Sequence, residues 1–135
     1  GDAKYKGSEG NHHLNKPIVA MASTVDGLGY WMVAADGGIF TFGDAKYKGS
    51  EGGSHLNSPI VGMAVAPGGQ GYWMVAADGG IFTFGLGAHY LGSAAPASPS
   101  SPIVSMDPAA AGVTGYWMAA ADGAVYPFGE LPLLR

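Results

Sequence analysis

The polar residues of this chain that could contact a ligand recur at a fixed spacing. His13 and Asn15 return 42 residues later as His55 and Asn57. A loop that carries His and Asn on a rigid scaffold suits ligand binding, because imidazole and amide groups hydrogen-bond to hydroxyls. The alternative is a loop that only caps the following strand. We predict no metal site here, since the adjacent pair His12 and His13 lacks a third ligand.

One tryptophan and one aspartate per repeat form a second candidate set. An aromatic face matches the apolar side of a pyranose ring, so the tryptophans suggest sugar stacking; the alternative is that they pack between neighbouring sheets. The aspartates could act as calcium ligands or acid catalysts, but each precedes a glycine in a hairpin, where Asp caps its own backbone. No EF-hand or nonapeptide calcium pattern surrounds them. The residues are Trp31, Trp73, Trp117, Asp36, Asp78 and Asp122.

Common catalytic motifs are missing from the sequence. It contains no Gly-x-Ser-x-Gly elbow, Walker loop or His-Glu-x-x-His motif. Its glutamates are Glu9, Glu51 and Glu130, and the first two are repeat equivalents in Gly-Ser-Glu-Gly turns. An active site would have to be assembled from copies of one group, and equivalent copies suit multivalent binding better than catalysis. We therefore predict a non-enzymatic protein without a cofactor.

These candidates belong to a sequence repeat. The segment 29–42 returns as 71–84 and, in looser form, as 115–128. A fixed period of this length marks a fold built from copies of one supersecondary unit. Within a single domain spanning 1–135, the repeats are 1–42, 43–84 and 85–128, followed by a C-terminal tail 129–135. The first two repeats differ at nine positions, which are 11, 12, 16, 20, 23–26 and 28.

Each repeat reads as four antiparallel strands. In the second copy, the apolar run 59–67 predicts a strand buried on both faces, and glycines then lead into a strand over 72–77. An Asp-Gly-Gly hairpin connects it to a strand over 81–84. A polar, outermost fourth strand is predicted over 3–6, 45–48 and 88–91. In this arrangement, the loop with His13 lies on the same side as the Asp-Gly hairpin.

Four antiparallel strands per repeat are the pattern of a β-propeller blade. The repeat resembles blades of the NHL and tectonin kinds. It is most similar to the Gly-Tyr-Trp-x-Val-x-x-Asp-Gly-Gly-Ile/Val-Phe-x-Phe-Gly-Asp-Ala repeats of secreted and surface proteins of actinobacteria. The resemblance implies an all-β propeller fold and an extracellular or cell-surface location, and it says little about function, because propellers host unrelated activities.

The phase of the repeat predicts self-association. The chain opens with a fourth-type strand and closes with the other three, and three blades are fewer than the usual minimum of four. We therefore expect two chains to form a six-bladed ring as a homodimer, each N-terminal strand completing a blade of the other. A β-trefoil is the alternative fold, although the Gln-x-Trp motif of ricin-like lectins is absent. A β-prism lectin is a third option, and its signature is missing too.

Composition limits the partners. The net charge is −4 and the chain has six Lys and Arg, so we expect no nucleic-acid partner. No apolar stretch is long enough to span a bilayer, and no cysteine is present. The chain starts at Gly1 within a repeat, which suggests a fragment or a processed product.

The expected function is lectin-like binding of glycan or cell-wall components at repeated inter-blade sites. The alternative is a structural or protein-interaction array without a small ligand.

Overall fold

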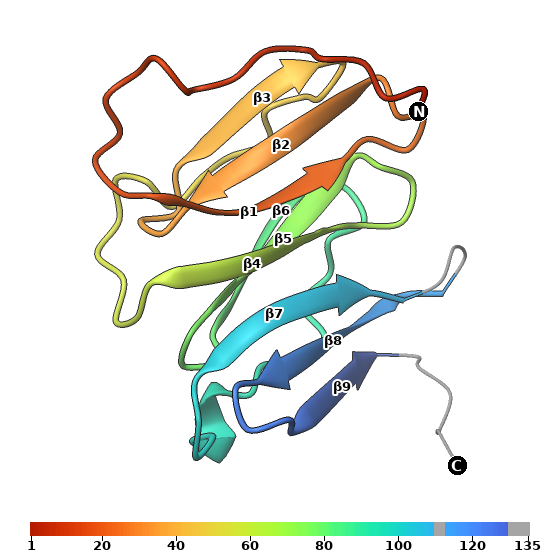
Figure 1. Ribbon diagram of the computed structural model, residues 1–135. Coiled ribbons are helices and arrows are strands. Elements are labelled where there is room, and N and C mark those ends of the chain that lie inside the picture. Colours follow the sequence, from red (N-terminus) through yellow and green to blue (C-terminus); the bar gives the residue numbers. More distant parts are fainter. Residues whose placement is uncertain (110–112, 130–135) are drawn as a thin grey trace.

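Each repeat folds into one three-stranded antiparallel sheet in the computed structural model, which describes residues 1–109 and 113–129 (Figure 1). The first sheet contains β1 (Ile18–Ser23), β2 (Gly29–Ala34) and β3 (Ile39–Gly43). The middle sheet contains β4 (Ile60–Val65), β5 (Gly71–Ala76) and β6 (Ile81–Gly85). The third sheet contains β7 (Ile103–Pro108), β8 (Gly115–Ala120) and β9 (Val125–Gly129).

The described residues are otherwise loops, apart from the short 3₁₀ helix η1 (Ala95–Ala97). The prediction of an all-β chain is thereby confirmed. Within these residues, no helix has the length and hydrophobicity needed to cross a membrane. Residues 130–135 of the predicted tail, and 110–112 of the third repeat, lie outside the described residues.

The sheets stack one on the next, with β1, β4 and β7 as neighbours (Figure 1). We call the packing of the first sheet on the middle sheet the first junction, and that of the middle on the third sheet the second junction. Backbone hydrogen bonds repeat at both. Ile60 N donates to Ala35 O at 2.8 Å, and Ile103 N donates to Ala77 O at 2.8 Å. The two junctions therefore share one geometry.

A bulge near the start of the first strand of each sheet sets which side chains enter a junction. In the middle sheet the register shifts between Ile60 and Gly62. Strict alternation would place Ile60 and Met63 on opposite faces, and the extra residue brings them to the same one. Both are buried in the cluster at the first junction.

The hydrophobic core is divided into two clusters, one per junction. At the first junction, Trp31 packs against the middle sheet, with its ring centroid 5.6 Å from that of Tyr72. At the second, Trp73 packs on the third sheet, 5.0 Å from Tyr116. Strand β5 is buried at every residue because its sheet is covered on both faces. Burial of such aromatic and aliphatic groups is the main stabilising term.

The fourth strand predicted over 3–6, 45–48 and 88–91 is not formed, and four-stranded blades are therefore not seen. The physical reason is a turn at the end of each third strand, such as that at Gly43, where φ is +67°. Ala45 N donates back to Phe42 O across this turn, so the chain leaves the edge of the sheet. Its backbone groups then bond to side chains instead of a neighbouring strand.

We call the stretch that follows each third strand, and its equivalent at residues 3–7, a crossing segment. Side-chain hydrogen bonds connect such a segment to two sheets. In the segment 44–49, Lys46 O accepts the indole N–H of Trp31 at 2.8 Å. The Tyr72 hydroxyl donates to Gly49 O at 2.6 Å and accepts from Lys48 N at 2.9 Å. Burial raises the pKa of Tyr72 above its ordinary value of 10.0 and outweighs the opposing hydrogen bond from Lys48. The crossing segment therefore fastens the first sheet to the middle one.

Candidate functional site

Two equivalent clefts lie where the loop before a sheet meets the Asp-Gly hairpin of that sheet. The first cleft encloses about 350 Å³, and its lining includes His13, Asn15 and Asp36. The second encloses about 290 Å³ and is lined by the repeat equivalents of these residues, His55, Asn57 and Asp78. The structure therefore brings the predicted histidine, asparagine and aspartate together, once in each of the first two repeats.

The aspartates hold the hairpin wall of each cleft. One carboxylate oxygen of Asp36 accepts from Gly38 N at 3.0 Å, and Asp78 accepts from Gly80 N at 2.9 Å. This confirms the predicted turn role. A carboxylate offers about four acceptor positions, so a turn bond and a ligand contact are compatible. A phenylalanine, Phe40, adds an apolar wall beside the polar groups of the first cleft.

The two clefts differ in charge. The first cleft has an ion-pair geometry in which His12 Nδ1 lies 3.2 Å from Glu9 Oε1, and this histidine is charged only when protonated. In the second cleft, serine stands at the equivalents of His12 and Lys16. The shared chemistry is therefore the His, Asn and Asp set, and the ionic groups distinguish the first cleft.

The third repeat does not reproduce the cleft. Its hairpin aspartate, Asp122, accepts from Ala124 N at 3.0 Å. The loop that should carry His and Asn has become Ala-Ala-Pro-Ala-Ser-Pro-Ser-Ser and contains η1. Ala95, in this η1 helix, lines the second cleft. The described part of the chain therefore has two copies of the set.

The tryptophans lie apart from both clefts. Trp31 and Trp73 are 1% and 0% exposed. Their indole N–H groups donate to Lys46 O and His89 O, each at 2.8 Å. Both indoles pack between sheets and neither offers an open face to a sugar ring, although Trp31 also lines a cavity between the β1–β2 and β4–β5 hairpins. Trp117, their equivalent in the third sheet, is only half-buried.

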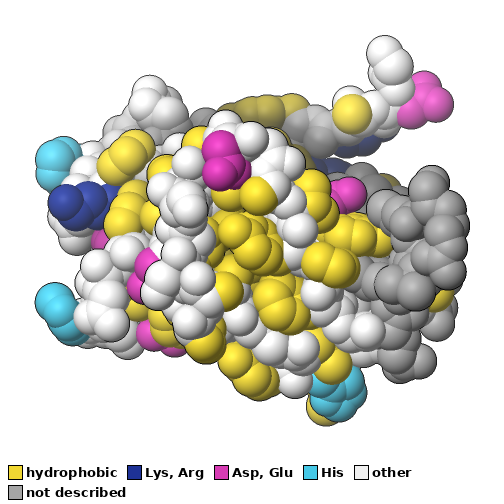
Figure 2. Space-filling view, turned by 90° about the horizontal axis from the view of Figure 1, so that it is seen from below, with side chains coloured by type: hydrophobic (Ala, Val, Ile, Leu, Met, Phe, Trp, Pro, Cys, Tyr) yellow, Lys and Arg dark blue, Asp and Glu magenta, His cyan; other side chains and the backbone are white. Residues whose placement is uncertain are grey.

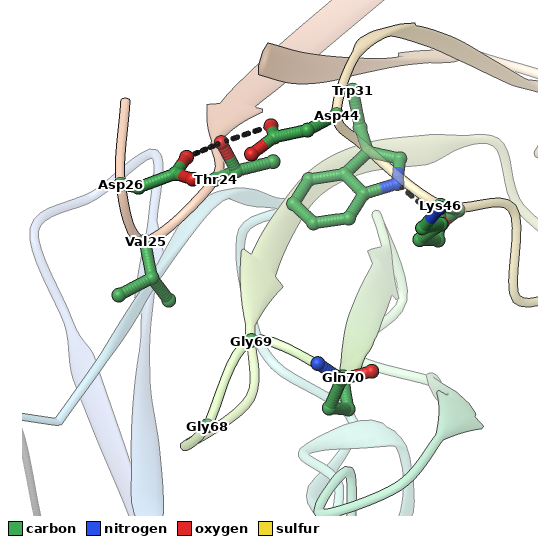
Figure 3. A pocket seen from close by; sticks show the side chains of 9 residues that line it. All are labelled: Thr24, Val25, Asp26, Trp31, Asp44, Lys46, Gly68, Gly69 and Gln70. Carbon is green, nitrogen blue, oxygen red and sulfur yellow. Dashed lines mark hydrogen bonds between the residues drawn. The ribbon is translucent and has the colours of Figure 1, made fainter. Parts of the chain in front are cut away.

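A third cavity, of about 430 Å³, lies between the β1–β2 and β4–β5 hairpins (Figure 3). The hydroxyl oxygen of Thr24 is 3.0 Å from Asp26 Oδ1 and 2.8 Å from Asp44 Oδ1. It is also 3.2 Å from Gly29 O. Because a hydroxyl has one proton, it can donate to only one of these three oxygens. One wall of this cavity is therefore rich in acceptors.

Sequence reasoning missed this cavity, although a signal was present. Thr24 and Asp26 fall within 23–26, where the first two repeats differ, and their equivalents are Ala66 and Gly68. The substitutions between near-identical copies thus mark a feature of the first junction. Asp44 contributes from a different part of the chain, and no local motif links it to Thr24.

Asp26 gives a pH-dependent test of this arrangement. The N–H of Leu28, bonded at 2.9 Å, lowers the pKa of Asp26 below its ordinary 3.8, and Asp44 and Thr24 act in the same direction. The folded state thus favours the ionised form, so this stabilisation is present above pH 3.8 and is lost as the pH falls through the lowered pKa. The side chain is fully exposed, so the effect is small and weakens with salt.

We expect Asp26→Asn to be less stable than the parent near neutral pH, with the difference shrinking as the pH falls below 3.8. Urea denaturation followed by circular dichroism at several pH values measures this difference. A stability difference that stays constant across the acid range would contradict the assignment.

Over 1–109 and 113–129, no three His, Asp or Glu side chains are grouped so that they could hold a metal ion. A scan against protein-family models and a search of curated proteins found no match to this chain.

Proposed function

We propose that this chain is a non-enzymatic binding module of the cell surface or extracellular space, which recognises a glycan or another cell-wall component through its two equivalent clefts. The single observation that carries the proposal is the repeated set itself. His13, Asn15 and Asp36 line one cleft, and the same residue types line the next.

The chemistry of the set fits hydroxyl-rich ligands. A sugar hydroxyl both donates and accepts hydrogen bonds. Neutral histidine offers one donor and one acceptor, asparagine offers both kinds, and aspartate only accepts. Phe40 in the first cleft and Phe82 in the second supply an apolar surface for the C–H face of a ring. The cleft volumes suit one sugar unit rather than a large ligand.

Repetition favours a polymeric ligand. The clefts lie on consecutive sheets joined by buried aromatic packing, so their spacing is held by the core. A ligand with repeating units can occupy both clefts at once. The second contact is then intramolecular, and two weak sites give an avidity that neither has alone.

The binding proposal is tested by replacing both histidines. We expect His13→Ala with His55→Ala to weaken binding to soluble cell-wall fragments at least about tenfold, measured by titration calorimetry on ligands selected from a glycan array. The matched control is His89→Ala, which removes an exposed histidine outside both clefts. The free energy of unfolding should change by less than about 0.5 kcal/mol in either variant. The absence of parent-chain binding above background at millimolar ligand would refute the proposal.

For the fold, we propose that the three sheets are blades of a β-propeller, with β1, β4 and β7 nearest the axis. The segments 3–6, 45–48 and 88–91 take the place of outer strands, and two chains complete a six-bladed ring. The support is the shared geometry of the two junctions, since blades of a propeller are related by one repeated rotation.

A structural or protein-interaction array is the second candidate. The observation that favours it is the exposed apolar surface at both ends of the stack, where Met21 and Val125 are more than half exposed. The paired histidine substitution separates the candidates. Reduced stability without any change in ligand binding would favour the structural role.

A further inference from the structure

Each end of the stack leaves one sheet face uncovered, and the two uncovered faces are of different kinds. The outer face of the third sheet presents Val104, Trp117, Ala119 and Val125, with Ser105 and Asp107 beside them. The outer face of the first sheet presents Met21, Tyr30 and Met32. Strand burial shows this directly: in β8 the half-exposed residues are Trp117 and Ala119, whereas in β2 they are Tyr30 and Met32.

The same repeat positions are buried wherever a neighbouring sheet is present. Met63 is 6% exposed at the first junction, and its equivalent Met21 is 59% exposed. Tyr72 is fully buried, whereas Tyr30 is only half-buried. Val125 is 58% exposed, and its equivalent Ile81 packs on the cluster at the second junction. The residue types at these positions are nearly the same in every repeat, so the absence of a neighbouring sheet explains the greater exposure.

Figure 2 views the outer face of the third sheet, where hydrophobic side chains gather at the centre of the surface. A shallow, mainly apolar cavity of about 290 Å³ lies on this face, and its lining includes Trp117, Ala119 and Val125 together with the polar residues Ser105 and Asp107. A mainly apolar sheet face that is open to solvent is a candidate interaction surface.

The internal junctions show what covers such a face. At each junction, a face bearing Trp and Val packs on a face bearing Tyr and Met from the next sheet. The chain leaves one face of each kind uncovered. The uncovered third-sheet face differs from the internal ones in carrying Ala119 in place of valine and Asp107 in place of the buried Ala64. We propose that the outer face of the third sheet docks, head to tail, on the outer face of the first sheet of a second copy. This inference rests on the two-chain ring proposed above and names its interface.

Three hydrogen bonds of the docked pair follow from the internal pattern. Trp31 and Trp73 donate to Lys46 O and His89 O, and Lys4 O of the second copy stands at the equivalent place for Trp117. By the same correspondence, Ile18 N of the second copy donates to Ala121 O. Glu9 N of the second copy donates to Gly123 O. The templates for the last two are the bonds from Ile60 N to Ala35 O and from Glu51 N to Gly37 O.

The surroundings of the hairpin glycines agree with this pairing. A Cβ added at Gly37 would lie 2.5 Å from Glu51 Cβ, and one added at Gly79 would lie 2.7 Å from Ala94 Cβ. At Gly123, no described atom lies within 4 Å of the added Cβ. The third hairpin thus has open space where the other two hold the loop of the next sheet.

In the second copy, the crossing segment at residues 3–7 does not block the docking face. Gly7 O accepts from the Tyr30 hydroxyl at 2.7 Å, as Gly49 O accepts from Tyr72 at 2.6 Å. Residues 3–7 thus already sit on the first sheet as their equivalents sit on the middle one. Docking then buries the surface beside them without rearrangement. A head-to-tail contact of this kind is heterologous, and it closes into a ring when the rotation between copies permits.

The test is the mass in solution. We expect the parent chain to sediment at twice its 13.6 kDa mass, and Val125→Asp to sediment as a monomer, because docking would then have to bury a second carboxylate on a face that already carries Asp107. The matched control is Leu86→Asp. Leu86 is 74% exposed, and aspartate is the residue at its repeat equivalent, Asp44. This control should remain a dimer, and circular dichroism checks that each variant is folded.

A second variant tests the orientation. Met21→Asp alters the opposite face and should also give monomers. A mixture of Val125→Asp and Met21→Asp chains should pair, because one junction then joins two unaltered faces. A parent chain that stays monomeric at high concentration would overturn the docking. So would a dimer that survives Met21→Asp but not Val125→Asp, which would mean that the third-sheet face pairs with itself.

Ligand titration keeps this test separate from the binding proposal. Val125→Asp leaves both clefts unaltered, so its monomers should still bind one soluble fragment per cleft. Loss of dimers with binding retained supports the docking surface. A monomeric parent that binds ligand overturns the docking alone, whereas a dimeric parent that binds none refutes only the ligand.

Discussion

Trp73→Ala is expected to lower the free energy of unfolding by about 3–5 kcal/mol, the range seen when a large aromatic residue is removed from a core. The indole is fully buried at the second junction, and its ring centroid lies 5.0 Å from that of Tyr116. Its N–H donates to His89 O, so truncation leaves that carbonyl without this partner as well. Urea denaturation followed by circular dichroism measures the loss.

Trp117→Ala is the matched control, because it removes the same residue type from the same repeat position. Trp117 is half-buried and faces the open end of the stack, so we expect a loss of about 1–2 kcal/mol. Both variants are best compared in the Val125→Asp background, where docking does not contribute. Equal losses would contradict the conclusion that stacking of the sheets, rather than packing within one sheet, stabilises the indole.

Gly79→Ala is expected to cost about 3 kcal/mol or more, from two causes that can be separated. At φ = +92° any L-residue is strained. In addition, the new Cβ would meet the backbone of Ala94 and Ala95 at 2.8 Å, where the loop of the third repeat crosses the hairpin. Backbone atoms cannot yield as a flexible side chain can, so the junction itself must open.

The control for Gly79 is Gly123→Ala. Its φ is +91°, so the conformational strain is matched. No described atom lies near the added Cβ, and we expect a cost of about 1–2 kcal/mol from strain alone. The difference between the two variants in the Val125→Asp background isolates the close approach of the loop. Equal losses of unfolding free energy in the two variants would mean that the loop does not approach the hairpin closely.

Local chemistry made much of the fold predictable. The strands predicted over 72–77 and 81–84 correspond to β5 and β6, and the run 59–67 contains β4. The Asp-Gly hairpin between β5 and β6 depends on one aspartate and the glycine after it, which need no distant partner. The cleft was predictable for the same reason, because only one antiparallel pair of strands separates its loop from its hairpin along the chain.

The errors have a common cause. The prediction of a fourth strand was wrong because backbone groups of 44–49 form hydrogen bonds with the side chains of Trp31 and Tyr72, which belong to two different sheets. No pattern within those residues distinguishes a strand from a segment that binds two side chains. The acceptor-rich cavity was missed likewise, because Asp44 reaches Thr24 only through the fold.

Apart from the fourth strand, which does not form, the repeats, the strands of each sheet, the Asp-Gly turns and the residue types of the clefts could be predicted from the sequence. These depend on neighbours within a few residues, so identical segments fold identically. Which copy of a residue is buried depends on whether another sheet packs against it. Trp73 and Trp117 share the context Gly-Tyr-Trp-Met, yet one is covered by the next sheet and the other lies on an open face. Burial depends on what lies across the junction, and the local sequence does not contain that information.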